Sequence, residues 1–281
     1  MVAIANSNLL YLSLVLLSLL ALYLPILQDL VPEWLNNDNY SHGFFIPLIS
    51  VYMIWSMREE LRKLPLEPCN WGVIWVILGL SQLALGYAGS EFFLKRSSLI
   101  IVLLGSIIFL FGMQYFRILL VPVMYLIFMI PLPAIIWNKI AFQLQLFSSS
   151  LAEHVVQFLG MSILRNGNIL YLPSTTLEVV DACSGLRSLM TMFTLSTFLA
   201  WQSDINLTKK WILVSSAIPI AIISNAIRLT ATAILASFYG ERVAQGFLHE
   251  FSGFVTFVLG TVLLIVVNYM LGLSQKRVPC H

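Results

Sequence analysis

The sequence predicts an all-α protein that crosses the membrane several times, and two observations support this prediction. Hydrophobic residues make up 59% of the 281 residues, charged residues only 10%, and the mean hydropathy is +0.90. Several apolar runs also reach the length of about 20 residues that a helix needs to cross a bilayer. A soluble protein of this size could not bury so much apolar surface, and a net charge of +2 is too small to indicate nucleic-acid binding.

The apolar runs predict about eight transmembrane helices in a single integral membrane domain, residues 1–281. The predicted spans are 8–27, 42–57, 71–89, 97–113, 118–137, 186–201, 212–235 and 251–273. The first span is expected to be retained, because it lacks the basic segment and the clear cleavage site of a signal peptide. Lys and Arg residues follow spans two, four, six and eight, so these loops are expected to be cytoplasmic. Both termini are then cytoplasmic.

Residues 138–182 form a predicted extracytoplasmic segment between the fifth and sixth spans. Apolar residues recur at helical spacing from Ile140 to Phe158, and the sequence SLAE at 150–153 is typical of a helix start. We expect an amphipathic helix on the outer membrane surface. A ninth span is the alternative, but the polar residues of this helix make it costly. The sequence NILYLPSTTLEVV (168–180) then predicts a short β-hairpin.

The sequence VVDACSGLRS (179–188) places a thiol, Cys183, in polar surroundings at the start of the predicted sixth span. Ser184 and Gly185 loosen the backbone beside the thiol, and a helix start offers backbone N–H donors and a positive dipole end. The other cysteines, Cys69 and Cys280, are not spaced as a disulfide framework or a thiolate metal site. Cys183 is therefore the cysteine for which a function is expected.

Three polar side chains from three different spans are predicted to lie at one depth on the outer side. Cys183 precedes span six, and His249 precedes span eight. Arg228 follows Lys210 by 18 residues, about 27 Å of helix rise, which brings it near the outer interface. His42, at the start of span two, is expected on the same side. Taken singly, the three residues have simpler explanations. Cys183 could be a small apolar filler, Arg228 a cation that snorkels to the headgroups, and His249 an interfacial hydrogen-bonding group.

These residue types together are suited to nucleophilic catalysis. A thiolate is a strong nucleophile, and a free cysteine needs a nearby cation or base to be deprotonated at neutral pH. His249 can accept the proton and return it to a leaving amine. Arg228 can hold a substrate carbonyl or its developing oxyanion. Asn225, on the same helix face as Arg228, can orient the guanidinium.

Four sequence blocks resemble the signature blocks of the exosortase/archaeosortase family. They are NDNYSHGFFIPLIS (37–50), LEVVDACSGLRSL (177–189), SNAIRLTATA (224–233) and HEFSG (249–253). They occur in the same order and with similar spacing, and they extend over most of the chain. The two middle blocks are the more specific.

The resemblance implies a cysteine membrane protease or transpeptidase with catalytic residues Cys183, Arg228 and His249 and without a cofactor or metal. Arg228 is then an oxyanion stabiliser or a proton donor, and His249 a general base and acid or a group that stabilises the transition state. Its partners are then membrane proteins with a C-terminal tripartite signal: a Pro-Glu-Pro-like segment, a transmembrane helix and a basic cluster. His249 and the block containing His42 fit the bacterial branch, which implies the bacterial inner membrane and a link to exopolysaccharide export.

Two other classes of function compete with this interpretation. A transporter or channel could use Arg228 and His249 as a substrate or proton relay, but the sequence shows no pair of broken helices at mid-depth. A component of a polysaccharide export complex without chemistry of its own is the second. A metalloprotease is not supported, because the sequence has no HExxH motif and its four histidines are scattered.

Overall fold

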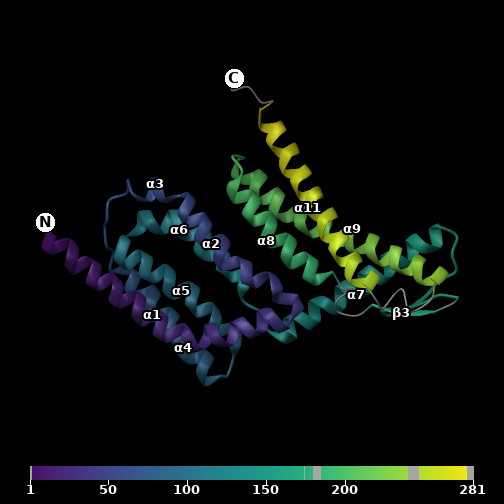
Figure 1. The fold of residues 1–281 in the computed structure, drawn as a ribbon, viewed down its shortest axis with the longest axis horizontal. Coiled ribbons are helices and arrows are strands. Elements are labelled where there is room, and N and C mark those ends of the chain that lie inside the picture. Colours follow the sequence, from purple (N-terminus) through teal and green to yellow (C-terminus); the bar gives the residue numbers. More distant parts are fainter. Residues whose placement is uncertain (1, 174, 180–184, 240–246, 277–281) are drawn as a thin grey trace. The chain divides into compact units, whose positions relative to one another are not determined.

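A computed structural model describes residues 2–173, 175–179, 185–239 and 247–276 (Figure 1). Helices dominate, and the chain divides into two compact units, Met1–Pro133 and Ala134–His281. Each unit has a buried apolar cluster of its own.

All secondary-structure elements described in the first unit are helices. Its elements are α1 (Val2–Asn36), the 3-10 helix η1 (Asp38–Phe44), α2 (Phe45–Ser56), α3 (Arg58–Leu61), α4 (Trp71–Ala88), α5 (Phe92–Phe111), α6 (Met113–Tyr125) and the 3-10 helix η2 (Leu126–Met129). Helices α4 and α5 pack closely because glycines lie at their contact. A Cβ atom on Gly72 would be only 2.6 Å from the carbonyl oxygen of Gly105. Small residues let membrane helices approach each other in this way.

Polar contacts hold the end of α1 within the first unit. The buried guanidinium of Arg96, on α5, forms an ion pair with Glu33. Next to it, Trp34 Nε1 donates a hydrogen bond to the carbonyl oxygen of Met129 at 2.9 Å. These contacts fix the entry into η1, the segment that carries His42.

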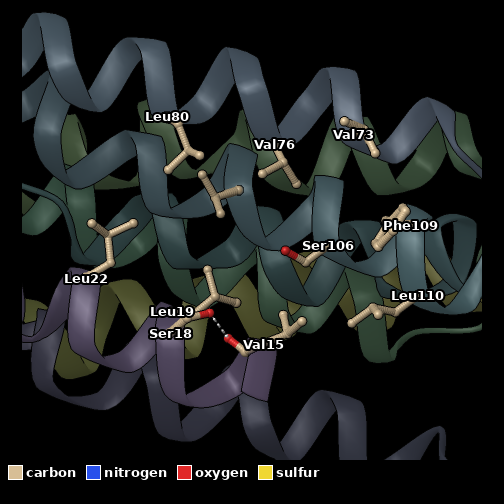
Figure 2. Close-up of a pocket in the computed structure, with 11 residues that line it drawn as sticks. Val15, Ser18, Leu19, Leu22, Val73, Val76, Leu80, Ser106, Phe109 and Leu110 are labelled. Carbon is tan, nitrogen blue, oxygen red and sulfur yellow. Dashed lines mark hydrogen bonds between the residues drawn. The ribbon is translucent and has the colours of Figure 1, made fainter. Parts of the chain in front are cut away.

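A groove of about 400 Å³ lies between α1, α4 and α5 in the first unit (Figure 2). Its lining residues are Val15, Ser18, Leu19, Leu22, Val73, Val76, Leu80, Val102, Ser106, Phe109 and Leu110. The Ser18 hydroxyl donates to the carbonyl oxygen of Val15 at 2.9 Å, within its own helix. The groove is therefore apolar over nearly all of its wall.

The second unit combines helices with a small sheet. Its elements are α7 (Ala134–Phe158), β1 (Leu164–Asn166), β2 (Ile169–Tyr171), β3 (Thr176–Glu178), α8 (Leu186–Gln202), α9 (Leu207–Tyr239) and α11 (Phe247–Lys276). A buried cluster joins α8, α9 and α11, and its members are Met192, Ala217, Ile220, Ala221 and Leu264.

Helix α7 buries several of its small and polar residues and exposes most of the large apolar residues of its predicted stripe. Gln145, Ser148 and Ala152 are buried, whereas Phe147 and Phe158 are 53% and 90% exposed. The apolar stripe predicted for this helix therefore faces away from the unit. Membrane helices show this pattern, because small residues form the protein contact and large apolar residues contact lipid.

The start of α7 differs from the prediction. Ser150 and Glu153 lie inside the helix, which begins at Ala134, so the predicted helix start at 150–153 is wrong. Glu153 instead accepts a hydrogen bond from Arg165 Nε at 2.9 Å.

The predicted fifth span, 118–137, is likewise not one helix. Helical structure stops at Met129 and resumes at Ala134. Pro131 and Pro133 lie in this break, and a proline removes the backbone N–H that a continuous helix needs.

Within the described residues, five helices are long and apolar enough to cross a membrane. They are Ser13–Asn36, Trp71–Ala88, Phe92–Phe111, Leu207–Phe238 and Ser252–Leu273. A sixth is obtained if Met113–Met129 and Ala134–Phe158 together form one broken span. The predicted spans 42–57 and 186–201 correspond to helices of only 12 and 17 residues, α2 and α8. An all-α membrane protein is confirmed, with fewer full-length spans than the eight predicted.

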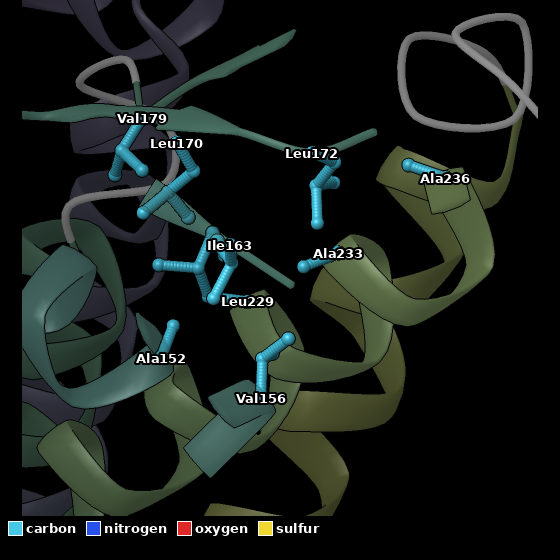
Figure 3. Packing of buried hydrophobic residues seen from close by; sticks show 9 residues of the cluster. All are labelled: Ala152, Val156, Ile163, Leu170, Leu172, Val179, Leu229, Ala233 and Ala236. Carbon is cyan, nitrogen blue, oxygen red and sulfur yellow. The ribbon is translucent and has the colours of Figure 1, made fainter. Parts of the chain in front are cut away.

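The sheet of the second unit is antiparallel, with the strand order β1-β2-β3. Strands β2 and β3 occupy the stretch where a hairpin was predicted, with Leu170 opposite Leu177. One face of the sheet packs on α7 and α9 (Figure 3). This packing involves Ile163, Leu170, Leu172 and Val179 with Ala152, Val156, Leu229, Ala233 and Ala236.

Candidate active site

Helix α9 carries two buried polar side chains that are among the predicted site residues, Asn225 and Arg228. They are 1% and 9% exposed, and their spacing of three residues places them on one face of the helix. Burying a guanidinium is costly, and an ionisable group within a membrane-spanning helix is rarely without a function. This face of α9 is therefore the starting point for the site.

Asn225 lies between α7 and the beginning of α8. Its Nδ2 donates a hydrogen bond to the Oγ of Ser148, on α7, at 3.1 Å. On the α8 side, a Cβ atom added to Gly185 would lie 2.9 Å from both Cγ and Nδ2 of Asn225. The amide is therefore packed directly against Gly185, the N-cap of α8.

Gly185 is the N-cap residue of α8 and has a φ of +82°. Residues with a side chain rarely adopt this left-handed conformation, so glycine suits the position. The carbonyl oxygen of Gly185 accepts a hydrogen bond from Leu189 N at 2.8 Å, which begins the helix. Cys183 and Ser184 lie immediately before this residue and outside the described ranges.

Arg228 faces α11. Its Nη1 is 3.7 Å from the position that a Cβ atom on Gly253 would occupy, so the guanidinium runs alongside the α11 backbone. Position 249 precedes Gly253 by four residues and shares its helix face. His249 lies in the first turn of α11, and its side chain is outside the described part of the protein.

His42, the remaining predicted site residue, belongs to the first unit and lies in η1. Neither ring nitrogen makes a hydrogen bond of good geometry with the described residues. Burial lowers the pKa of His42, because a charged imidazole loses hydration there. The backbone of Phe128 raises the pKa, but by less than burial lowers it. The neutral imidazole is therefore favoured.

Two residues of this neighbourhood, Ser148 and Gly253, were not among the predicted site residues. Ser148 could have been found from the recurrence of small or polar residues along one face of α7, which includes Gln145 and Ala152. Gly253 was part of the HEFSG block, but a glycine without a side chain gave no reason to place Arg228 beside it.

The arrangement favours negative charge close to the start of α8. The N-terminus of a helix carries a partial positive charge, and Gly185 brings it within one helical turn of the Arg228 position on α9. A guanidinium offers several N–H donors in a fixed plane. Together these groups can stabilise a thiolate or the oxyanion of a reacting carbonyl.

Comparison with known proteins assigns the chain to a family. The sequence model of the transmembrane exosortases matches residues 34–266, which include every residue of the site described above. No curated protein and no solved structure matches the chain. Because the match extends over most of the sequence, the protein belongs to the transmembrane exosortase family.

Proposed function

We propose that the protein is a membrane-embedded cysteine peptidase or transpeptidase that cleaves C-terminal sorting signals. Membership of the transmembrane exosortase family supports this proposal. One observation carries it furthest: Gly185, two residues after Cys183, packs against Asn225 on the face of α9 that holds Arg228. The start of α8 and the Arg228 face of α9 then belong to one neighbourhood, and the proposed nucleophile precedes the start of α8 in the sequence.

The proposed reaction has two steps. In the first, the Cys183 thiolate attacks the scissile carbonyl carbon, the C–N bond breaks, and a thioester forms as the amine leaves. In the second, an amine or water attacks the thioester carbon, and the thiolate leaves. An amine acceptor gives a new amide, whereas water gives a free carboxylate.

His249 and Arg228 have complementary roles in this proposal. His249 takes the proton of the thiol and donates it to the leaving amine. Arg228 binds the carbonyl oxygen while it carries negative charge, which lowers the energy of both tetrahedral intermediates. Asn225 positions Arg228 and the turn before α8. The chemistry requires no cofactor.

The proposed substrates are membrane proteins with a Pro-Glu-Pro-like segment, a transmembrane helix and a basic cluster at their C-terminus. With the substrate helix beside α8, α9 and α11, the scissile bond lies at the extracytoplasmic face. The proposal includes a location in the bacterial inner membrane with both termini in the cytoplasm, and a link between protein sorting and exopolysaccharide export.

The test is processing of a co-expressed reporter that carries such a signal. Cys183→Ala and Cys183→Ser are expected to reach the membrane in normal amounts and to leave the reporter uncleaved. Cys69→Ala, which changes a cysteine of the first unit, is the matched control and should process the reporter normally. Mass spectrometry of the new C-terminus then distinguishes a carboxylate from an adduct. A fully active Cys183→Ala enzyme would refute the proposed function.

A further inference from the structure

Strand β3 is an edge strand of the sheet that packs on α9. The order β1-β2-β3 leaves one side of β3 without a partner strand in the described part of the chain. An edge strand presents unpaired N–H and C=O groups that can pair with another extended chain.

The hydrogen bonds between β2 and β3 show which residues form this edge. Leu172 and Thr175 exchange two backbone hydrogen bonds, of 2.9 Å and 3.3 Å, and Val179 N donates to Asn168 O at 2.9 Å. In an antiparallel ladder, hydrogen-bonded and non-hydrogen-bonded pairs alternate. Leu177, midway between Thr175 and Val179, is therefore also bonded to β2.

The intervening residues of β3, Thr176 and Glu178, have the opposite orientation. Their partners across the ladder, Tyr171 and Ile169, form non-hydrogen-bonded pairs with them. Their N–H and C=O groups are therefore directed away from β2, toward the free side of the sheet. Their side chains are exposed, so the edge is accessible.

Packing on the helices holds this edge in place. Val179 is 1% exposed and belongs to the cluster that includes Val156 of α7 and Leu229 of α9 (Figure 3). Leu177 packs against the same cluster. Leu229 directly follows Arg228, so the sheet is anchored on the turn of α9 that belongs to the candidate site.

We propose that the free edge of β3 binds an extended peptide segment of the substrate as an additional strand. The inference rests on the proposed function and adds the binding mode. Main-chain hydrogen bonds to Thr176 and Glu178 would align the segment, as in other cases of strand addition. Glu178 precedes Cys183 by five residues, about 17 Å of fully extended chain. A segment bound at β3 therefore lies within reach of the proposed nucleophile.

A peptide segment suits this edge better than a second copy of the protein. The strand has three residues, and only two of them direct backbone groups outward. A stable protein interface buries about 800 Å² on each partner, far more than two residues can supply. A membrane-anchored substrate, by contrast, is held at the site by its own helix and needs only a short alignment contact.

Glu178→Pro and Glu178→Ala form the matched pair for the test. Proline at position 178 removes only the N–H directed away from β2, and the ladder to β2 remains. Alanine removes the same carboxylate and keeps the N–H. Both changes are made in the Cys183→Ala protein, so that binding is measured without cleavage. The probe is a synthetic peptide with a Pro-Glu-Pro segment, an apolar helix and a basic cluster, in lipid nanodiscs.

The proline variant is expected to bind the probe about fivefold to tenfold more weakly than the alanine variant, the effect of one hydrogen bond. Equal affinities, or no binding to the alanine variant, overturn the proposal. A dimer that light scattering detects in the alanine variant and not in the proline variant would also overturn the proposal, because a second copy of the protein would then occupy the edge. Failure of the proposed function would appear elsewhere, as normal processing by Cys183→Ala.

A second measurement covers a proline variant that unfolds. Replacing single amides of the probe by esters removes one peptide N–H at a time. Strand pairing predicts that affinity falls at alternate positions, because successive N–H groups of a strand point to opposite sides. A loss without this period of two, or no loss at any position, contradicts the proposal.

Discussion

The backbone of Gly185 lies against the side-chain amide of Asn225, closely enough that a Cβ atom at position 185 would be 2.9 Å from Nδ2. A distance below 3.0 Å cannot be accommodated unless one side moves. The contact joins the N-cap of α8 to the middle of α9, and it leaves room only for glycine. It therefore fixes the start of α8 against the face of α9 that carries Arg228.

Replacing Gly185 by alanine should damage the site both through its positive φ and through a collision with Asn225. A second glycine, Gly160, allows the cost of the positive φ to be measured separately. The φ of +82° is unfavourable for alanine by about 1–2 kcal/mol, and the collision with Asn225 adds about 1–3 kcal/mol of overpacking. Gly160→Ala shares the first cost only, because Gly160 has a φ of +80° with nothing within 4 Å. Unfolding in detergent and reporter processing should both fall further for Gly185→Ala. Equal losses would show that the contact with Asn225 is unimportant.

Ser148→Ala should weaken the site from the α7 side. The substitution removes the acceptor of the 3.1 Å hydrogen bond from Asn225 Nδ2, at a position with 4% exposure. Removing the partner of a buried donor costs about 1–3 kcal/mol. We expect lower thermal stability and slower processing of the reporter, because the amide that packs against Gly185 can then rotate.

Ser149→Ala is the matched control for this substitution. Ser149 is as deeply buried, but its hydroxyl donates to the carbonyl oxygen of Gln145 within α7 at 2.6 Å. Such bonds within a helix add little stability, so the control should remain close to the unmodified protein. Similar losses for both serines would indicate a general effect of small cavities in α7 and not a role for the Asn225 contact.

Helix α7 shows where interpretation of the sequence succeeds and where it stops. Periodicity identified a helix with an apolar stripe, and Phe147 and Phe158 of that stripe are exposed. Periodicity does not reveal which face meets the protein when the surrounding solvent is lipid, because apolar side chains are satisfied on both sides. The contact face was therefore missed, and Ser148 with it. The break before Ala134 was missed because the run from 118 to 137 is apolar despite Pro131 and Pro133.

The candidate site shows the same division. The position of Asn225 and Arg228 on one face of α9 could be predicted, because polar residues stand out in an apolar helix and the two are three residues apart. The role of Gly253 could not, because it depends on how α9 and α11 pack. The positions of Cys183 and Ser184 remain predictions, since these residues lie outside the described ranges.

His42 predicts a pH dependence of the first unit. Burial holds its pKa below the usual value of 6.5, so the unfolded chain binds a proton at a higher pH than the folded protein does. The free energy of unfolding is therefore complete above about pH 6.5 and decreases as the pH falls toward the folded-state pKa. Chemical unfolding in detergent between pH 8 and pH 5 should show this loss, and His42→Asn should reduce it.

An unchanged pH profile in His42→Asn would contradict the expectation. His154→Asn, which changes an exposed histidine of α7, is the control.

Gly253 provides a test of the Arg228 position that leaves the guanidinium itself unchanged. A Cβ atom at residue 253 would be 3.7 Å from Arg228 Nη1, an ordinary van der Waals contact, so Gly253→Ala should process the reporter almost normally. The additional carbon atoms of leucine would occupy the space of the guanidinium and displace it. A displacement of about 1 Å in a catalytic group can lower the rate 100-fold, so Gly253→Leu should lose at least about tenfold in processing.

The control for this series is Gly272→Leu on the same helix, because Gly272 has nothing within 4 Å of its Cβ position. It adds the same side chain to α11 at a position with open space around the Cβ atom, and processing should be retained. Thermal unfolding of the three variants separates loss of the fold from loss of the site. If Gly253→Leu folds and processes the reporter at the normal rate, Arg228 does not have to lie beside α11 for the reaction. Its role in stabilising the oxyanion would then have to be assigned to another donor.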